Sequence, residues 1–311
     1  MATRSEYLSI SRRGIDFDSV PMRLFQKSKK LGIWDPMAFD LTQDRRDWEA
    51  LNQTRRDDLI STTTLFQAGE EAVTLDLLPL VMAVARQGRL EEEIYLTSFL
   101  WEEAKHTEFF RRWLDEVPQI GGQDLHDYIG PNYRTLFFEE LPTTMGRLLN
   151  DSSNEALARA LTTYNMMIEG VLAETGYHSY SKLLEAGRLF PGLAGALKLI
   201  SRDETRHIRF GVYMLQLLIQ QDGTMWEVVQ RRMEELMPIV LGIVGPPPPE
   251  EGVVIPDDSV FAADPDEMSR FAMTQYQRRM HVLERARGQS LAELKEEVAE
   301  ELTEEFFATG G

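Results

Sequence analysis

Glu103-Ala104-Lys105-His106 and Glu204-Thr205-Arg206-His207 are two copies of one short motif, Glu-x-x-His, and they decide how this chain folds. Residues three apart lie on the same face of a helix, so each glutamate points the same way as its histidine. A carboxylate and an imidazole aimed together suit a transition metal. Each motif also has a candidate partner upstream: Glu70 lies 33 residues before Glu103, and Glu169 lies 35 residues before Glu204. The spacing predicts one metal centre built from four helices.

The composition excludes several other classes of function. The 311 residues are 43% hydrophobic and 27% charged, which is typical of a soluble globular protein. The net charge of −18 argues against nucleic acid and anionic membrane surfaces, because phosphates would be repelled. The chain has no cysteine, which excludes disulfides, zinc-thiolate sites, iron–sulfur clusters and cysteine nucleophiles. The N-terminus lacks the apolar core of a secretory signal and no apolar run is long enough for a membrane span, so we expect a cytoplasmic protein.

Helical periodicity predicts an all-α fold with a four-helix core over about residues 54–221. The four predicted helices each carry part of the motif set and span about 54–87, 90–116, 155–184 and 193–221. Pro79 should kink or end the first of them, since proline lacks a donor and clashes with the preceding turn. Further helices are predicted over 133–149, interrupted near Pro142, and up to about residue 244. No stretch shows the alternation of a strand.

Residues 1–245 are therefore expected to form one domain, with the first twenty residues as a tail and an apolar stretch near Met22 to Phe25 that docks it. Pro246 to Pro249 reads as a stiff connector. Two amphipathic helices then close the chain and pack on the same domain, and the last begins with a capping box at Ser290.

Two copies of the motif on separate long helices are much stronger evidence for a metal site than one. The chain has only five histidines, and two of them stand in these motifs. The neighbours of Glu70 and Glu169 are mostly apolar, and a carboxylate on such a face would be costly to bury alone. Glu71 and Glu102 compete as ligands within their Glu-Glu pairs. A set of four carboxylates and two imidazoles favours iron or manganese, and the spacing does not choose between them.

This constellation is that of the ferritin-like carboxylate proteins, and the chain over roughly residues 20–240 resembles the ribonucleotide reductase small subunit and its relatives. Trp34-Asp35-Pro36 is similar to the Trp-x-Pro element of those subunits. The resemblance implies an electron-transfer relay of Trp34, Asp203 and His106. Taken alone, Trp34 is equally well explained as ordinary core packing.

Two departures from the standard small subunit narrow the resemblance. The radical-bearing tyrosine, seven residues after the first motif glutamate, is replaced here by Phe110, and the first ligand, ordinarily Asp, is Glu70. Both changes are shared by the manganese/iron subgroup. A working reductase subunit also needs a tyrosine in its C-terminal tail, whereas the last tyrosine here is Tyr276.

The stretches 68–74 and 164–170 resemble the small-subunit-like ligand-binding oxidases. That family implies a manganese/iron oxidase that reacts with dioxygen, binds a long-chain fatty acid or similar apolar ligand, and forms an ether cross-link between a valine and a tyrosine. The matching residues are Val73 and Tyr164. The resemblance places manganese at Glu70, Glu103 and His106, and iron at Glu169, Glu204 and His207. Two irons are an alternative occupancy, and a homodimer is expected.

The residues themselves support the cross-link only in part. Val73 lies three residues from Glu70 and shares its face. Tyr164 lies five residues from Glu169, about 140° away on a regular helix, so a π-bulge or side-chain reach would have to close that gap. Tyr177 lies two turns beyond Glu169 and is a candidate neighbour of the centre. Rival interpretations are a manganese/iron reductase small subunit, a ferritin-like storage protein and an arylamine-type oxygenase.

Overall fold

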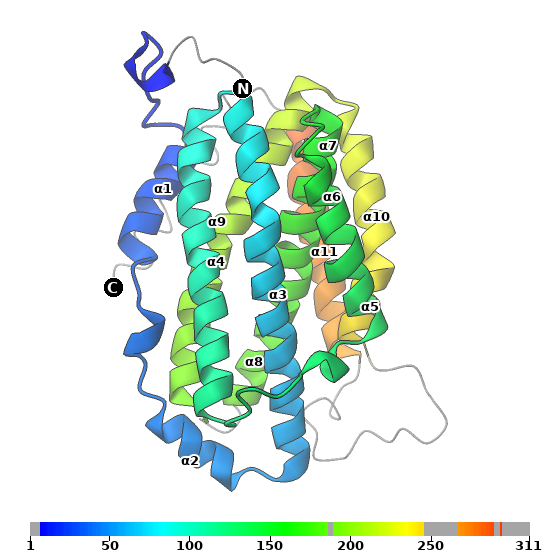
Figure 1. The fold of residues 1–311 in the computed structure, drawn as a ribbon. Helices are drawn as coiled ribbons and strands as arrows, with labels where there is room; N and C mark the ends of the chain where they lie inside the picture. The colour runs from blue at the N-terminus through cyan, green and yellow to red at the C-terminus, as the bar shows by residue number, and fades with distance from the viewer. Residues whose placement is uncertain (1–6, 186–188, 246–265, 289–292, 294–311) are drawn as a thin grey trace.

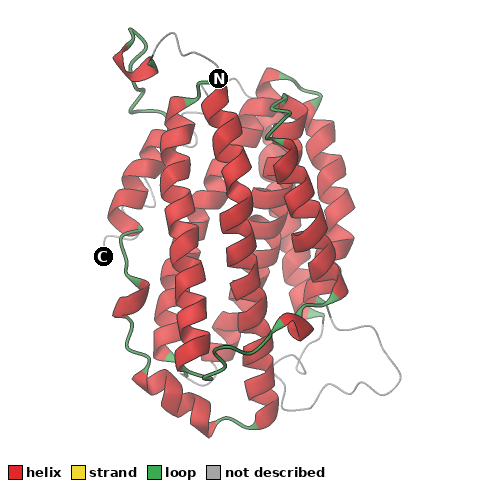
Figure 2. Ribbon diagram, in the orientation of Figure 1, coloured by secondary structure: helices red, strands yellow, loops and turns green. Residues whose placement is uncertain are grey.

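The computed structural model describes residues 7–185, 189–245, 266–288 and 293, and within these residues it contains helices and no strand (Figure 2). The predicted all-α fold is confirmed. Figure 1 shows long helices running side by side along one axis, with α3 and α4 in front and α9 behind them. The expected polyproline connector, the capping box at Ser290 and the C-terminal tail lie outside the described residues.

The four predicted core helices are present with nearly the expected bounds. They are α3 (Gln53–Arg86), α4 (Leu90–Glu116), a composite helix of α7 (Asn154–Leu161), η5 (Thr162–Ala173) and α8 (Glu174–Glu185), and α9 (Pro191–Gln221). Side-chain caps fix two of the starts: Asn52 accepts a hydrogen bond from the Arg55 amide at 3.0 Å, and Ser153 accepts one from Ala156 at 3.3 Å.

Neither of the two prolines expected to interrupt a helix ends one. Pro79 lies inside α3, which continues without a break to Arg86. Pro142 stands in the first turn of α6 (Leu141–Arg147), which continues the helical segments α5 (Pro131–Arg134) and η4 (Thr135–Glu140). Leu77 and Leu80 are fully buried on either side of Pro79, so this part of α3 packs in the core despite the donor that proline lacks.

Two segments, η4 and η5, are π-helices rather than α-helices. The longer one, η5, is buried along ten of its residues and lies at the centre of the bundle between α9, α10 and α11. Close packing against α9 depends on Gly211, because a Cβ at this position would overlap the side chain of Asn165. π-helices are uncommon and occur frequently at functional sites.

The N-terminal segment does more than form a tail. After η1 (Leu8–Ile10), helix α1 (Val20–Leu31) buries Val20, Met22 and Leu24 against α4 and α9. The turn η2 (Pro36–Ala38) and helix α2 (Thr42–Ala50) then cross one end of the bundle to reach α3 (Figure 1). The remaining described elements are η3 (His126–Tyr128), α10 (Met225–Val244), α11 (Glu267–Arg285) and η6 (Ala286–Gly288).

Candidate metal centre

The six residues that the sequence predicts as ligands come together in the middle of the bundle. They form two groups in which carboxylate oxygens and histidine nitrogens lie within 4.8 Å of one another, and every member is buried. The first group is Glu70, Glu103, His106 and Glu204, and the second is Glu103, Glu169, Glu204 and His207. Four separate helices, α3, α4, η5 and α9, supply these side chains.

Glu103 and Glu204 belong to both groups because they lie between the two histidines. His106 Nδ1 is 3.5 Å from Glu103 Oε2 and 3.2 Å from Glu204 Oε1. His207 Nδ1 is 3.0 Å from Glu103 Oε1 and 3.6 Å from Glu204 Oε2. Each of these two glutamates thus offers one oxygen to each histidine, as a bridging carboxylate does.

Glu70 and Glu169 complete the groups at opposite ends. Glu70 Oε2 lies 3.4 Å from His106 Nδ1, and Glu169 Oε1 lies 3.8 Å from His207 Nδ1. Glu71, a competing candidate ligand, is exposed and stands outside both groups.

Several atoms that face this centre are buried and have no hydrogen-bond partner: both carboxylate oxygens of Glu103, one oxygen each of Glu169 and Glu204, and Nδ1 of both histidines. Leaving buried polar atoms without partners is costly. A pair of cations would satisfy all of them at once, and a set of four carboxylates and two imidazoles suits iron or manganese. The residues therefore fit a two-metal cofactor.

Without a cation, protons must compensate the crowded carboxylates. Burial raises the pKa of Glu70 to about 8 and raises that of Glu169 well above its usual value. Burial would lower the pKa of both histidines, but the carboxylates beside them raise it well above the ordinary range. Burial also favours a neutral Glu103, yet His207 and His106 hold its pKa below its usual value. Metal binding would displace protons from these groups.

The outer nitrogen of His106 faces a hydrogen-bonded carboxylate. Its Nε2 lies 3.4 Å from Asp203 Oδ2, and the same oxygen accepts a 2.7 Å hydrogen bond from the indole nitrogen of Trp34. The Trp34 and His106 rings stack with centroids 6.0 Å apart. The structure thus brings together the three residues that the resemblance implied as a relay.

The outer nitrogen of His207 faces Glu102, at 2.9 Å from Oε2. Glu102 is therefore a partner of a candidate ligand and not a competing ligand, and a Cβ at Gly32 would overlap its carboxylate. Arg206 donates to Glu102 at 2.6 Å and to Asp203 at 2.5 Å, so one guanidinium joins the two outer carboxylates. Such carboxylates fix the orientation and tautomer of a metal-binding histidine.

The π-helix closes the gap between Tyr164 and Glu169. Its i to i+5 hydrogen bonds place residues five apart on adjacent turns. Tyr164 is fully buried and its hydroxyl donates to the backbone carbonyl of Val73 at 3.2 Å. Tyr177 donates to Glu70 at 3.4 Å. The predicted pair Val73 and Tyr164 is thus in contact beside the centre.

Some residues around the centre were not found from the sequence. Asn165 donates to Glu169 Oε2 at 2.8 Å and to the His207 carbonyl at 3.3 Å. Lys105 lies 3.2 Å from Asp203, and Arg206 forms ion pairs with Glu102 and Asp203. The sequence does contain one signal for the carboxylates behind the histidines. Glu102 and Asp203 each directly precede a motif glutamate, so the full repeat is acid-Glu-x-x-His.

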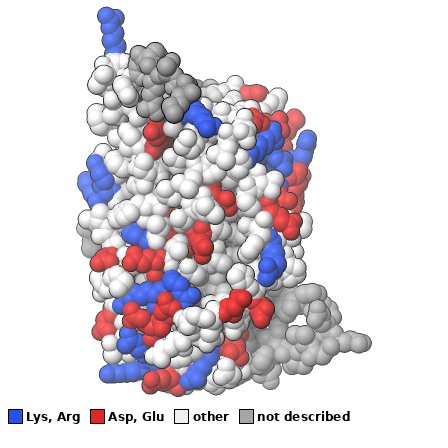
Figure 3. All heavy atoms as spheres, in the orientation of Figure 1, with Lys and Arg blue, Asp and Glu red and all other residues white. Residues whose placement is uncertain are grey.

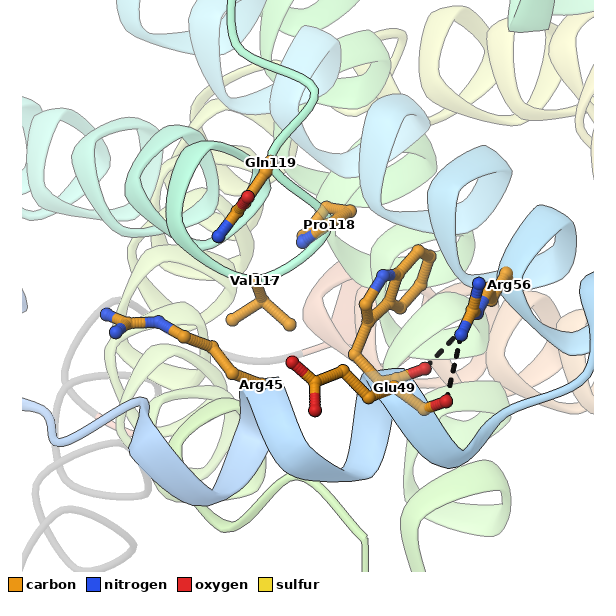
Figure 4. Close-up of a pocket in the computed structure, with 7 residues that line it drawn as sticks. Arg45, Glu49, Arg56, Val117, Pro118 and Gln119 are labelled. Atoms are coloured by element: carbon orange, nitrogen blue, oxygen red, sulfur yellow. Dashed lines mark hydrogen bonds between the residues drawn. The ribbon is translucent and has the colours of Figure 1, made fainter.

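A separate hollow lies at the end of the bundle where α2 meets α3 and α4 (Figure 4). Its lining residues are Arg45, Trp48, Glu49, Arg56, Val117, Pro118 and Gln119. Both arginines are already engaged: Arg56 donates to the carbonyls of Trp48 and Glu49, and Arg45 pairs with Glu116 at 2.5 Å. This hollow contributes no side chain to the centre.

Comparison with known proteins adds to this geometry. The family described as ribonucleotide reductase, small chain, matches residues 23–240. Solved structures of R2-like ligand-binding oxidase are similar over 90% of this chain and 98% of theirs, with 36% identity. Two of these structures are variants of the oxidase. The TM-score with this chain is 0.82 for a variant in which a valine is replaced and 0.83 for a variant in which a glycine is replaced. Both neighbours carry an anaerobically reconstituted Mn/Fe cofactor. No helix in the described part of this chain is long and apolar enough to cross a membrane.

Proposed function

The chain belongs to the ribonucleotide reductase small-chain family of dimetal oxidoreductases and, within it, to the R2-like ligand-binding oxidases, and we propose that it activates dioxygen at a manganese/iron pair. The observation that carries this proposal is the set of buried, unpartnered carboxylate and imidazole atoms that face one another in the bundle. The manganese/iron occupancy follows the cofactor of the neighbours, and metal analysis distinguishes it from two irons.

Each metal would be held by one outer glutamate, one histidine and the two motif glutamates that lie between the metals. We assign manganese to the end with Glu70 and His106, and iron to the end with Glu169 and His207. Glu103 and Glu204 would be shared, because each lies within 3.6 Å of both histidines. When bound and reduced, the pair supplies electrons to dioxygen.

The chain's own part in the reaction is the oxidation of Val73 by two electrons. The valine Cβ–H and the Tyr164 O–H bonds break, a Cβ–O ether bond forms, and two electrons and two protons pass to dioxygen. The contact of Tyr164 with the Val73 backbone supports this pairing. In variants of the neighbour oxidase, the replaced glycine and the replaced valine lie four residues apart, as Gly69 and Val73 do here. A third variant of that oxidase replaces a tyrosine.

The ligand is proposed to be a long-chain fatty acid or a similar apolar molecule. The residues beside the iron end support an apolar ligand: Ile168 and Val171 flank Glu169 and are buried, and Phe99 covers the His207 ring at 3.7 Å. Mass spectrometry of an organic extract of the purified protein identifies a retained ligand. A sample that carries no apolar molecule would contradict this part of the proposal.

We also propose that the protein is a homodimer. Leu75, Leu78 and Met82 form an exposed apolar stripe along α3, at the three- and four-residue spacing of a helix contact. A second copy would cover this stripe. Sedimentation of the purified protein as a monomer would contradict the dimer, and a large cage would favour iron storage instead.

A reductase small subunit is the rival function within the same family. At the position of its radical-bearing tyrosine this chain has Phe110, which stacks on Phe66 with centroids 5.4 Å apart and offers no hydroxyl. Formation of a cross-link in the absence of a second protein favours the oxidase.

Glu103→Ala tests the centre directly, because it removes a carboxylate that both groups share. We expect the variant to lose binding of the metal pair and to lose metal-dependent oxygen consumption. Glu108→Ala is the matched control, since Glu108 is exposed on the same helix. Two metals per chain and unchanged oxygen consumption in Glu103→Ala would overturn the assignment.

A further inference from the structure

A chain of contacts leads from the outer side of His106 to the protein surface. We propose that Trp101, Lys105 and Trp34 form an electron path along it, and that α1 beside them is the docking surface of a small acidic one-electron carrier protein. This inference rests on the proposed function, because the path serves the metal pair.

The contacts of Lys105 connect two indoles. Its ammonium lies 4.2 Å from the centroid of the Trp34 ring and 4.4 Å from that of the Trp101 ring. Trp101 is 45% exposed, whereas Lys105 is buried and also lies 3.2 Å from Asp203. Trp34 in turn donates to Asp203 and stacks on His106. Successive contacts therefore connect the exposed indole of Trp101 to His106, a candidate metal ligand.

The charge of α1 identifies the kind of partner. The protein carries a net charge of −18, yet α1 contains four cations, Arg23, Lys27, Lys29 and Lys30, and no acid. Lys29 and Lys30 are exposed in its last turn, close in sequence to Trp34. Figure 3 shows Lys and Arg side chains at the edge of the molecule where α1 lies in Figure 1. A cationic face on an acidic protein attracts and orients an acidic partner.

The electron count explains why such a partner is needed. Reduction of dioxygen to two water molecules takes four electrons and four protons. A bound, reduced metal pair would supply two of these electrons; formation of the Val73–Tyr164 cross-link would supply the other two with two protons, and the remaining two protons would come from solvent. After one such reaction the pair would lack two electrons, and the cross-link, already formed, could not supply them again. Two one-electron carriers, each oxidised once, would return the pair to its reduced state through Trp101.

The docking surface is tested first, on the metal-free protein. A plant-type ferredoxin serves as the acidic probe, and its affinity is measured by interferometry at low and high salt. We expect salt-sensitive binding that weakens at least about tenfold in Lys29→Glu/Lys30→Glu. Arg231→Glu is the matched control, an exposed cation on α10 at the opposite side of the bundle (Figure 1). Equal affinity of the wild type and the double variant would overturn the docking surface.

The path is tested on metal-loaded, oxygen-reacted protein, by following its absorbance after mixing with photoreduced ferredoxin. Trp101→Phe and Lys105→Met should slow reduction severalfold while ferredoxin affinity stays unchanged. Trp48→Phe is the control, because Trp48 also pairs with a cation, Arg56, but belongs to α2, which crosses one end of the bundle in Figure 1 and is not part of the path. Wild-type rates in both path variants would overturn the path. A wild type that loads no metal pair would instead refute the proposed function, before any carrier is added.

Discussion

The two histidines of the centre stand in the same motif but in different surroundings. His106 faces Asp203 and Trp34, and beyond them Lys105 and the exposed Trp101. His207 faces Glu102, and its ring is covered by Phe99, which is fully buried. One half of the centre therefore has a polar and aromatic connection to the surface, while the other half is closed by the hydrophobic core.

The motif fixes the ligands, while the residues around each histidine give the two halves different roles. Arg206 connects the two halves, because it donates hydrogen bonds to Glu102 behind His207 and to Asp203 behind His106. The open half suits electron transfer, and the closed half, with Tyr164 and the π-helix, suits chemistry away from water. Variants in each half show which features the halves share and which they do not.

The largest expected effect is one that both halves share, the pH dependence of the metal-free protein. Burial raises the pKa of Glu70 from 4.5 to about 8, and raises that of Glu169 in the same direction. The folded state thus holds protons that the unfolded chain has lost. Its free energy of unfolding should fall by several kcal/mol as the pH rises from about 5 to about 8.

Urea unfolding of the metal-free protein across this pH range measures the effect. Glu70→Gln and Glu169→Gln should each flatten the profile, because an amide does not titrate. Added metal should restore stability at the upper end of the range, where the ligands lose their protons more readily. A free energy of unfolding that increases with pH in the metal-free wild type would contradict this account.

The next effect belongs to the closed half. Glu102→Ala leaves Arg206 short of one of its two carboxylates and removes the partner of His207 inside the core. Breaking a buried ion pair in this way should lower the free energy of unfolding by about 3–5 kcal/mol. Glu102→Gln, which keeps the shape and an acceptor, should lose less. The control Glu108→Ala on the same helix should stay within about 0.5 kcal/mol, and an equally small loss in Glu102→Ala would refute the role of Glu102.

A smaller effect is expected in the open half. Trp34→Phe removes one hydrogen bond to Asp203, which keeps its contacts with Lys105 and Arg206. The loss should be about 1.5–3 kcal/mol, typical of a hydrogen bond to a charged group. Metal content should remain at the wild-type level while ferredoxin-driven reduction slows. Loss of the metal pair in this variant would show that Trp34 supports the ligands themselves and would remove the distinction between the halves.

The sequence predicted the core helices and the residues gathered in the site because both depend on local rules. The Glu-x-x-His spacing aligns each pair on one helix face, and the bounds of α4 followed from the break at Gly88 and from Val117-Pro118. Tyr177 was anticipated from its position on the helix of Glu169, whereas Trp34 and Asp203 were implied by the family resemblance; the structure brings all three to the centre. Val73 and Tyr164 came from resemblance, and their contact depends on a helix type that periodicity does not reveal.

The remaining features arise from packing between elements distant in the sequence. Pro79 was expected to kink or end α3, but the helix continues through it to Arg86, with its neighbours Leu77 and Leu80 buried in the core. The π-helix η5 packs so closely against α9 that a Cβ at Gly211 would overlap the side chain of Asn165. Glu102 and Arg206 pair across 104 residues of sequence, so nothing local to either of them indicates the partner.

Peptide mass spectrometry of the wild type, loaded with manganese and iron and then exposed to oxygen, tests the central claim most directly. We predict one joined pair of peptides that contains Val73 and Tyr164 and is lighter by two hydrogen atoms than the separate peptides. Tyr164→Phe, which keeps the ring but lacks the hydroxyl, should bind the metals and give no joined pair. Separate, unmodified peptides from metal-loaded, oxygen-reacted wild-type protein would contradict the oxidase function proposed for this chain.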